Sequence, residues 1–155
     1  EFKDVTFVIN TPENSWRQYE NKKFIIDKLN VIIRHYTYEE MVYGDFEEFF
    51  NVAVIYLSLP ESIHKAAMPI KLFQYIGMGL PVIGCGKSAY GDFIKKNDIG
   101  WVLEDWNEIY PLLSFLKRNP KEIFSKHKNV LKVKKDNSWK ARVNKVETLL
   151  EQNCK

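Results

Sequence analysis

The chain has 155 residues, of which 45% are apolar, 14% aromatic and 28% charged, and its formal net charge is +3. These proportions are typical of a globular domain, and they exclude an intrinsically disordered chain, a collagen-like repeat and a small disulfide scaffold. At this length we expect one compact domain over residues 1–155, which buries roughly 70% of the surface exposed by the unfolded chain.

Apolar segments of strand length alternate along the chain with segments of helical pattern. β-branched and aromatic residues predict strands at 5–9, 31–33, 52–57, 82–83 and 101–103. Helical patterns are found at 17–29, 38–50, 69–78, 90–96 and throughout the C-terminal part. Ser138 is expected to cap a last helix. The residues expected to share one face of that helix are Trp139, Val143, Val146 and Leu150.

Strands that are apolar throughout, with helices between them, predict an α/β fold: a parallel sheet with helices on both faces, followed by C-terminal helices. In such a sheet, ligands bind at the carboxyl ends of the strands, where loops lead into helix N-termini. The loops to consider are therefore 10–17, 34–38, 58–70 and 84–90.

The cysteine content indicates the cellular compartment of the protein, and the N-terminus indicates its relation to a longer chain. Cys85 and Cys154 have no companions at metal-ligand spacing, which is typical of a reducing compartment. No apolar run approaches the roughly 20 residues of a membrane span, and no signal peptide opens the chain, so we expect a cytoplasmic protein. The chain begins at Glu1 without Met and enters a strand almost at once, as expected for a piece of a longer protein.

Positive charge is concentrated in residues 117–145, where eleven Lys and Arg side chains accompany only Glu122 and Asp136. The segment therefore carries +9 and the rest of the chain −6. Such a segment attracts phosphates, and we expect peripheral contact with an anionic membrane, a solvated helical face being the alternative. No aromatic side chains interleave with the basic ones to stack bases, so nucleic-acid binding is not expected.

The segment 68–84 carries the most chemical information. Pro69 suits the first helical position, and the N–H groups that follow it form a ready anion site at the positive end of the helix dipole. Lys71 lies in that first turn, where the dipole disfavours a cation unless an anion such as a diphosphate lies between them. Gln74 is one turn further on the same face and can hydrogen-bond a sugar or a base. A solvated Lys71 and a surface Gln74 are the structural alternative.

These residues resemble the donor-binding motif of glycosyltransferases with two facing Rossmann-like domains, the GT-B fold. The motif of the C-terminal domain, P-x-K-L-F-E-Y-x-x-x-G-x-P-V-I, is matched by Pro69-x-Lys71-Leu72-Phe73-Gln74-Tyr75 and Gly79-x-Pro81-Val82-Ile83. The resemblance extends over nearly the whole chain, with weaker matches in the flanking strands. Two positions depart from the family: Gln74 replaces a Glu, and Ala66 stands where many relatives have the first acid of an E-x7-E pattern. The pattern is closer to the inverting glucuronosyltransferases of xanthan-type polysaccharide assembly.

The resemblance implies a Rossmann-like domain that binds a nucleotide-sugar, with UDP as the expected nucleotide, for transfer to a glycan or lipid-linked acceptor. Lys71 would contact the diphosphate and Gln74 the ribose. The full set of donor-binding residues implied is Tyr56, Pro69, Ile70, Lys71, Gln74, Gly84 and Gly86. The catalytic base would come from an N-terminal partner domain outside this chain, so the chain alone would be inactive. No metal or cofactor is expected.

Two alternatives from other classes remain. The sequence from Gly84 to Ala89 satisfies G-x-G-x-x-G/A with Glu104 and Asp105 about 20 residues later, which is the pattern of a nicotinamide dinucleotide site. Against that site, we expect Gly91 to break the following helix, and we interpret the glycines as a turn that allows the backbone to approach a ligand. A non-catalytic α/β binding module is the other alternative. The histidines, His35, His64 and His127, lack metal-ligand spacing.

Overall fold

The computed structural model describes residues 5–10, 31–34, 36–37, 39–40, 44, 50–55 and 61–153. The chain divides into two compact units, Glu1–Gly44 and Asp45–Lys155. The helix predicted at 17–29, and all of the one predicted at 38–50 except a few residues, lie outside the described residues.

The first unit contains two parallel strands, as the sequence predicted. Strand β1 (Phe7–Asn10) pairs with β2 (Val31–Arg34), Phe7 opposite Val31. After β2, the backbone N–H of Thr37 donates to Glu40 Oε2 at 2.7 Å, and the N–H of Glu40 donates to Thr37 Oγ1 at 3.2 Å. This reciprocal pair is a capping box, and it marks the start of helix at Glu39 and Glu40. The two hydrogen bonds lower the pKa of the Glu40 carboxyl.

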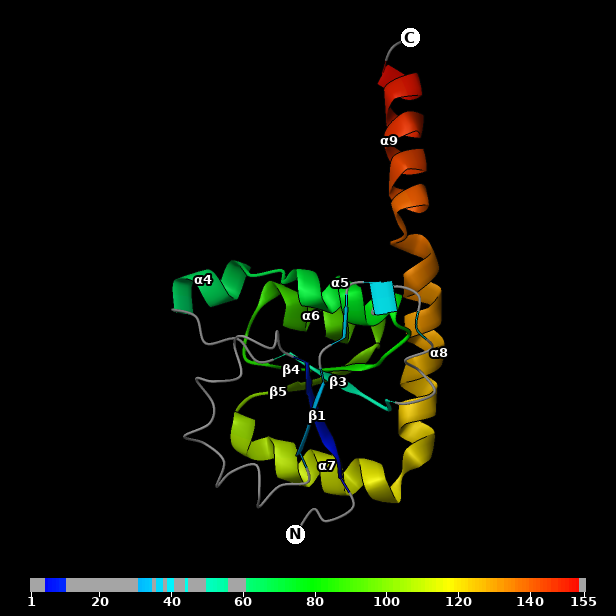
Figure 1. Ribbon diagram of the computed structural model, residues 1–155. Coiled ribbons are helices and arrows are strands. Elements are labelled where there is room, and N and C mark those ends of the chain that lie inside the picture. Colours follow the sequence, from blue (N-terminus) through cyan, green and yellow to red (C-terminus); the bar gives the residue numbers. More distant parts are fainter. Residues whose placement is uncertain are drawn as a thin grey trace. The chain divides into compact units, whose positions relative to one another are not determined.

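The second unit is an α/β arrangement around an open sheet of three parallel strands, in the order β3-β4-β5 (Figure 1). These strands are β3 (Ala53–Val54), β4 (Val82–Cys85) and β5 (Gly100–Leu103), with Val82 opposite both Ala53 and Gly100. The sheet is consistent with a Rossmann-like fold. Of the described residues in the predicted strand 52–57, Ala53 and Val54 form β3, and residues 56 and 57 lie outside the described part. Strands β4 and β5 match their predicted places.

Helices occupy most of the rest of this unit. Their bounds are α4 (Glu61–Ala66), α5 (Ile70–Gly77), α6 (Ala89–Asn97), the 3-10 helix η2 (Trp106–Glu108), α7 (Ile109–Arg118), α8 (Pro120–Asp136) and α9 (Trp139–Asn153). Helix α4 falls in the segment that the sequence predicted as the loop 58–70. The other helices agree with the predicted helical segments to within a residue or two.

The core is built around β4, in which all four residues are buried. Val82 packs in one cluster with residues of α5, α6 and α8, among them Leu72, Ile94 and Val130. Ile83 and Cys85 pack in a second cluster, with Leu103 and side chains of η2 and α7. Because successive side chains of a strand point to opposite sides, this alternation explains why the sequence of β4 is apolar without interruption.

Side chains of helix α8 form hydrogen bonds with the C-terminal ends of α5 and α6. His127 Nδ1 lies 2.8 Å from the carbonyl oxygen of Gly79, just beyond α5, and a carbonyl can only accept, so the imidazole donates. The C-cap of α6 is Asp98, in the left-handed conformation at φ 53°. Its carboxylate accepts from Lys126 Nζ and from Asn129 Nδ2, the latter at 2.9 Å.

Helix α9 begins as predicted, because the N–H of Ala141 donates to Ser138 Oγ at 3.1 Å. The guanidinium of Arg142 lies 4.7 Å from the ring centroid of Phe73 in α5. Further along α9, the apolar side chains are about half exposed; they are Val143, Val146, Leu149 and Leu150. In the part of the chain that the structure describes, no helix has both the length and the apolar character needed to cross a membrane.

Candidate functional site

The described residues that the sequence predicted as a donor site lie around the start of α5 and the carboxyl end of β4. Pro69 is the N-cap residue of α5, with φ −68° and ψ 139°, rather than the first helical residue as predicted. Its extended backbone is the ordinary N-cap conformation, and proline brings no side-chain oxygen that could accept from the first helical N–H groups. The first turn also contains no acidic residue. The positive end of the α5 dipole is therefore left without a compensating group from its own turn.

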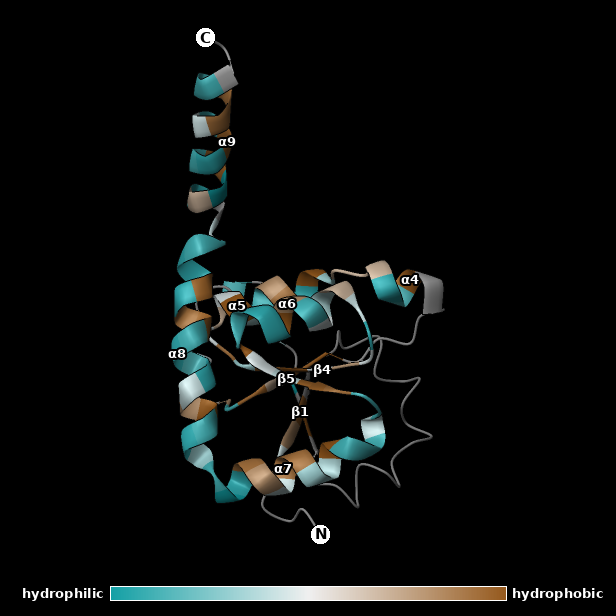
Figure 2. Cartoon of the chain, turned by 180° about the vertical axis from the view of Figure 1, so that it is seen from behind, coloured by the Kyte–Doolittle hydropathy of each residue, from teal (hydrophilic) through white to brown (hydrophobic). Residues whose placement is uncertain are grey.

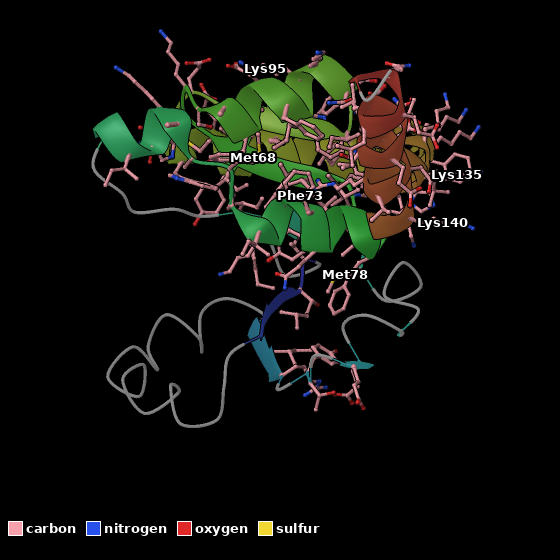
Figure 3. The ribbon with its side chains drawn as sticks, turned by 90° about the horizontal axis from the view of Figure 1, so that it is seen from above. Met68, Phe73, Met78, Lys95, Lys135 and Lys140 are labelled. Carbon is pink, nitrogen blue, oxygen red and sulfur yellow. The ribbon has the colours of Figure 1, made fainter. Side chains whose placement is uncertain are left out.

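Lys71 and Gln74 share the outward side of α5. Lys71 is exposed and forms no ion pair with a described residue, while Gln74 is half-buried and its amide has no hydrogen-bond partner in the described part of the chain. Ile70, beside them, is 77% exposed. The spacing of three residues between Lys71 and Gln74 places both side chains on one side of α5. In Figure 3, α5 runs between the labelled Met68, which precedes it, and Met78, which follows it.

The opposite side of α5 fixes this geometry. Leu72 and Ile76 are buried in the core, and the ring of Phe73 meets that of Phe93 in α6 edge to face, with centroids 5.8 Å apart. Burial raises the pKa of the Tyr75 hydroxyl. Packed residues therefore determine the direction of α5 and, with it, the side on which Lys71 and Gln74 lie.

Gly84 lies inside β4 rather than in the turn after it. A Cβ at this position would lie 2.7 Å from Cε2 of Tyr90 and 3.2 Å from Cδ1 of Ile94. The buried Tyr90 hydroxyl in turn donates to the carbonyl oxygen of Cys85 at 2.8 Å. Gly84 thus makes room for a tyrosine that ties α6 to β4, which is a packing role and not the predicted role in a turn.

Gly86 is the residue that turns the chain after β4. Its φ is +80°, a conformation that glycine adopts at little cost, and its N–H donates to the carbonyl oxygen of Leu103 at 2.8 Å. A Cβ here would also lie 3.0 Å from Cε1 of His64. His64 comes from α4, and its ring meets that of Tyr90 edge to face at 5.8 Å. The structure therefore brings His64, Gly86 and Tyr90 together at the carboxyl end of β4.

The contact between His64 and Gly86 is the feature that sequence reasoning missed. A lone histidine in a predicted loop is usually solvated, whereas His64 is half-buried on a helix. The glycine 22 residues later gave the only available signal, since a glycine in a turn marks a position where something approaches the backbone. The sequence could not say that the approaching group is His64.

The start of α6 differs from that of α5. Ser88 is buried and is the N-cap, and its Oγ accepts from the N–H of Gly91 at 3.1 Å. Asp92 adds a negative charge in the first turn. A Cβ at Gly91 would lie 3.3 Å from Cγ1 of Val102 in β5, so this glycine allows close packing of helix on strand. The prediction that Gly91 breaks the helix was wrong, since α6 continues through Gly91 to Asn97. The absence of a side chain at Gly91 lets the helix pack close to the sheet.

Acidic residues follow β5. Glu104 lies 3.8 Å from Lys95 in an exposed ion pair, and Asp105 caps η2 by accepting from the N–H of Asn107 at 2.7 Å. Burial, followed by the charges of Asp105, Glu108 and Glu104, raises the pKa of the Cys85 thiol. The thiol is therefore neutral at physiological pH, which disfavours it as a nucleophile. Among the described residues, no three His, Cys, Asp or Glu side chains are grouped so as to hold a metal ion.

The site residues named from the sequence are therefore placed in two groups. Pro69, Ile70, Lys71 and Gln74 lie together at the first turns of α5, and Gly86 lies at the turn between β4 and α6. Tyr56 lies outside the described residues. The arrangement at α5 offers backbone N–H groups, one ammonium group and one amide to a ligand, which suits an anion carrying hydroxyl groups. Comparison with protein-family models, with curated proteins and with solved structures finds no match for this chain.

Proposed function

We propose that this chain is the donor-binding domain of a glycosyltransferase, and that a nucleotide-sugar lies along the carboxyl edge of the sheet with its diphosphate at the start of α5. One observation carries the proposal. The helix that holds the motif Pro69-x-Lys71-Leu72-Phe73-Gln74-Tyr75 begins without a capping side chain, and its Lys71 is exposed and has no ion pair with a described residue. The contrast with α6, which Ser88 caps, favours α5 as the place for an anion.

The chemistry follows from those groups. The diphosphate leaves with extra negative charge when the sugar is transferred, and a helix N-terminus with a lysine beside it stabilises that charge. Gln74 donates to and accepts from the ribose hydroxyls. The reaction also needs a general base and an acceptor site, which we assign to an N-terminal domain of the same enzyme.

The finer description of the fold belongs to the same proposal. We take the domain to be Rossmann-like with helices on both faces of its sheet, as in the C-terminal domain of GT-B enzymes. The second unit, with its parallel order β3-β4-β5 and apolar clusters that contain alternate residues of β4, supports this description. We place the enzyme in the cytoplasm, where nucleotide-sugars are made, and in the assembly of a polysaccharide.

The test is a calorimetric titration of the 155-residue chain with UDP, GDP and NAD. We expect saturable UDP binding, weakened about 10-fold or more by Lys71→Ala, because a hydrogen bond to a charged group is worth about 1.5–3 kcal/mol. Gln74→Ala should weaken it by about 5-fold, the loss expected for a neutral hydrogen bond of about 1 kcal/mol. Lys95→Ala, an exposed lysine on α6, is the matched control and should leave the affinity unchanged. Equal effects of Lys71→Ala and Lys95→Ala on UDP binding would refute the site.

A second candidate function, nicotinamide dinucleotide binding, is favoured by one observation. Strand β4, helix α6 and strand β5 form a parallel β-α-β unit, with Gly86 at its turn and Glu104 directly after β5. This is the arrangement in which the acid after the second strand binds a ribose. Here the titration should show NAD binding that Lys71→Ala leaves intact and Glu104→Ala weakens. Binding of none of the three nucleotides would favour the non-catalytic α/β binding module.

A further inference from the structure

The contacts of α8 determine which of its sides faces outward. Val130 and Val133 are buried in the core, and His127 and Lys126 reach the ends of α5 and α6. The side chain of Lys126 is only 17% exposed, since it is paired with Asp98. Lys126 is therefore part of the anchored side of α8 and does not belong to its free surface.

Four other lysines of α8 lie on the side opposite these anchors. The spacings of seven, four and three residues between them keep them on one stripe of the helix. The members of this lysine stripe are Lys121, Lys128, Lys132 and Lys135, and all are exposed. At 1.5 Å per residue the stripe is about 21 Å long. Figure 2 shows hydrophilic residues over most of α8.

An exposed aromatic ring adjoins the stripe. Phe124 is 61% exposed, and the ammonium of Lys128 lies 4.8 Å from its ring centroid. Leu131, about two turns further along α8, is also exposed. Two acids flank the stripe on α8, Glu122 and Asp136. The stripe thus combines an excess of positive charge with apolar groups that water solvates poorly.

We propose that the lysine stripe of α8, with Phe124, docks this protein on the surface of an anionic lipid bilayer. This inference is independent of the proposed function. Charge complementarity selects the partner: a bilayer presents negative charge over a flat area, so that all four ammonium groups meet it at once. The Phe124 ring enters the boundary between headgroups and acyl chains, and the lysine stems lie along it with their charges in the headgroup layer.

Nucleic acid is the less suitable polyanion for this surface. Stacking of unpaired bases needs several aromatic rings in sequence, and the stripe has one. The stripe also contains no arginine, the residue that binds phosphates and base edges with two hydrogen bonds. The lysine stripe should therefore recognise its partner through the density of negative charge on the partner's surface, and not through a nucleotide sequence.

The experiment is co-sedimentation of the chain with vesicles of 70% phosphatidylcholine and 30% phosphatidylglycerol, and with vesicles of phosphatidylcholine alone, in 0.1 M and 0.5 M NaCl. The stripe variant is Lys128→Gln/Lys132→Gln. The matched control is Lys95→Gln/Lys96→Gln, which removes the same charge from exposed positions on α6. Because each lysine near an anionic surface contributes about five-fold to the partition coefficient, the stripe variant should bind about 25-fold more weakly. Phe124→Ser should weaken binding in both salt conditions.

The outcomes separate the alternatives. Binding to anionic vesicles alone, reduced at 0.5 M salt and lost in the stripe variant but kept in the control, supports docking by α8. Equal losses in the two double variants, or no vesicle binding by the unmodified chain, would overturn it. So would tighter binding to a single-stranded oligonucleotide than to vesicles at the same salt. All substituted side chains are exposed, so the thermal melting of the variants should match that of the unmodified chain.

Discussion

The two ends of α5 and α6 differ in how their backbone groups are satisfied. At the C-terminal ends, His127 bonds to Gly79, and Lys126 and Asn129 bond to Asp98, so α8 closes both helices. At the N-terminal ends, α6 has its own cap in Ser88, and α5 has no capping side chain. We call the C-terminal ends of α5 and α6 the closed end, and their N-terminal ends the open end.

The closed end and the open end should contribute to different properties, the first to stability and the second to ligand binding. Contacts at the closed end join residues 28 to 48 positions apart in the chain, so they contribute to the tertiary structure. The open end presents Lys71 and Gln74, whose side chains form no ion pair or hydrogen bond with the described part of the chain, so their loss should cost little stability. Substitutions at the closed end should therefore change the free energy of unfolding, and substitutions on the open side of α5 should change nucleotide affinity.

The largest effect is expected for Gly100→Ala at the closed end. A Cβ at Gly100 would lie 1.8 Å from the carbonyl oxygen of Val82, and backbone atoms of paired strands cannot move apart without breaking the sheet. We expect a loss of about 3 kcal/mol or more in the free energy of unfolding, the upper range for overpacking. Urea denaturation followed by far-UV circular dichroism measures it, and a loss below about 1 kcal/mol would contradict the close approach of β4 and β5.

Gly86→Ala tests whether the open end also carries stability. The positive φ costs an alanine about 1–2 kcal/mol, and the Cβ meets His64. Adding His64→Ala should recover the steric part of the loss and leave the part due to φ. A double-mutant cycle over the two positions measures the coupling, and full additivity would show that His64 does not press on Gly86.

Asp98→Asn should show how much the contacts of α8 at the closed end contribute to the free energy of unfolding. Asparagine tolerates the left-handed conformation but removes the charge that pairs with the poorly exposed Lys126, so we expect a loss of about 1 kcal/mol. The comparison is Glu104→Gln, whose pair with Lys95 is more than half exposed on both sides and should contribute at most about 0.5 kcal/mol. Equal losses in chemical denaturation would mean that the Asp98 pair is no better than a surface pair.

Gly77→Ala should stabilise the protein slightly. Gly77 is the last residue of α5, has no atom within 4 Å of the place of a Cβ, and is not among the residues of positive φ. Alanine reduces the freedom of the unfolded chain, so we expect a gain of about 0.5 kcal/mol. The midpoint of urea denaturation should rise, and the nucleotide affinity should stay the same, because the change lies at the opposite end of α5 from Lys71.

The smallest effect is a dependence on alkaline pH. The pKa of Cys85 is raised in the folded state, so its contribution to stability is complete below the ordinary thiol pKa and is lost as pH rises through the folded value. The free energy of unfolding should therefore fall above about pH 9, and Cys85→Ala should reduce that fall. The comparison needs Cys154→Ser in both proteins, so that Cys85 is the only thiol. An identical pH dependence with and without Cys85 would show that the fall in stability at alkaline pH does not come from the Cys85 thiol.

Much of the local structure could be predicted from the sequence. The uninterrupted apolar runs gave the parallel strands β1, β2, β4 and β5, and Ser138 gave the start of α9, because periodicity and capping depend on neighbouring residues. What failed depends on contacts between different helices and strands. The tolerance of α6 for Gly91 depends on Val102, and the role of Gly84 depends on the ring of Tyr90. Helix α4 is only six residues long and has too few turns for a periodic pattern.

The candidate site was predictable to a different degree. The order of Pro69, Lys71 and Gln74 was enough to locate the start of α5, although not to within one residue, since cap positions are decided by backbone angles. The contact of His64 with Gly86 was not predictable, because it joins a helix and a turn that share no sequence pattern.

The complete burial of β4 has a consequence for the chain before it folds. No charged residue occurs between Lys71 and Lys87, and the stretch includes the β-branched pair Val82 and Ile83. An uncharged segment of this kind, exposed on a newly made chain, tends to pair with copies of itself. Pro81, which lacks an N–H to donate, directly precedes β4 and limits such intermolecular pairing during synthesis until α5 and α6 cover the strand.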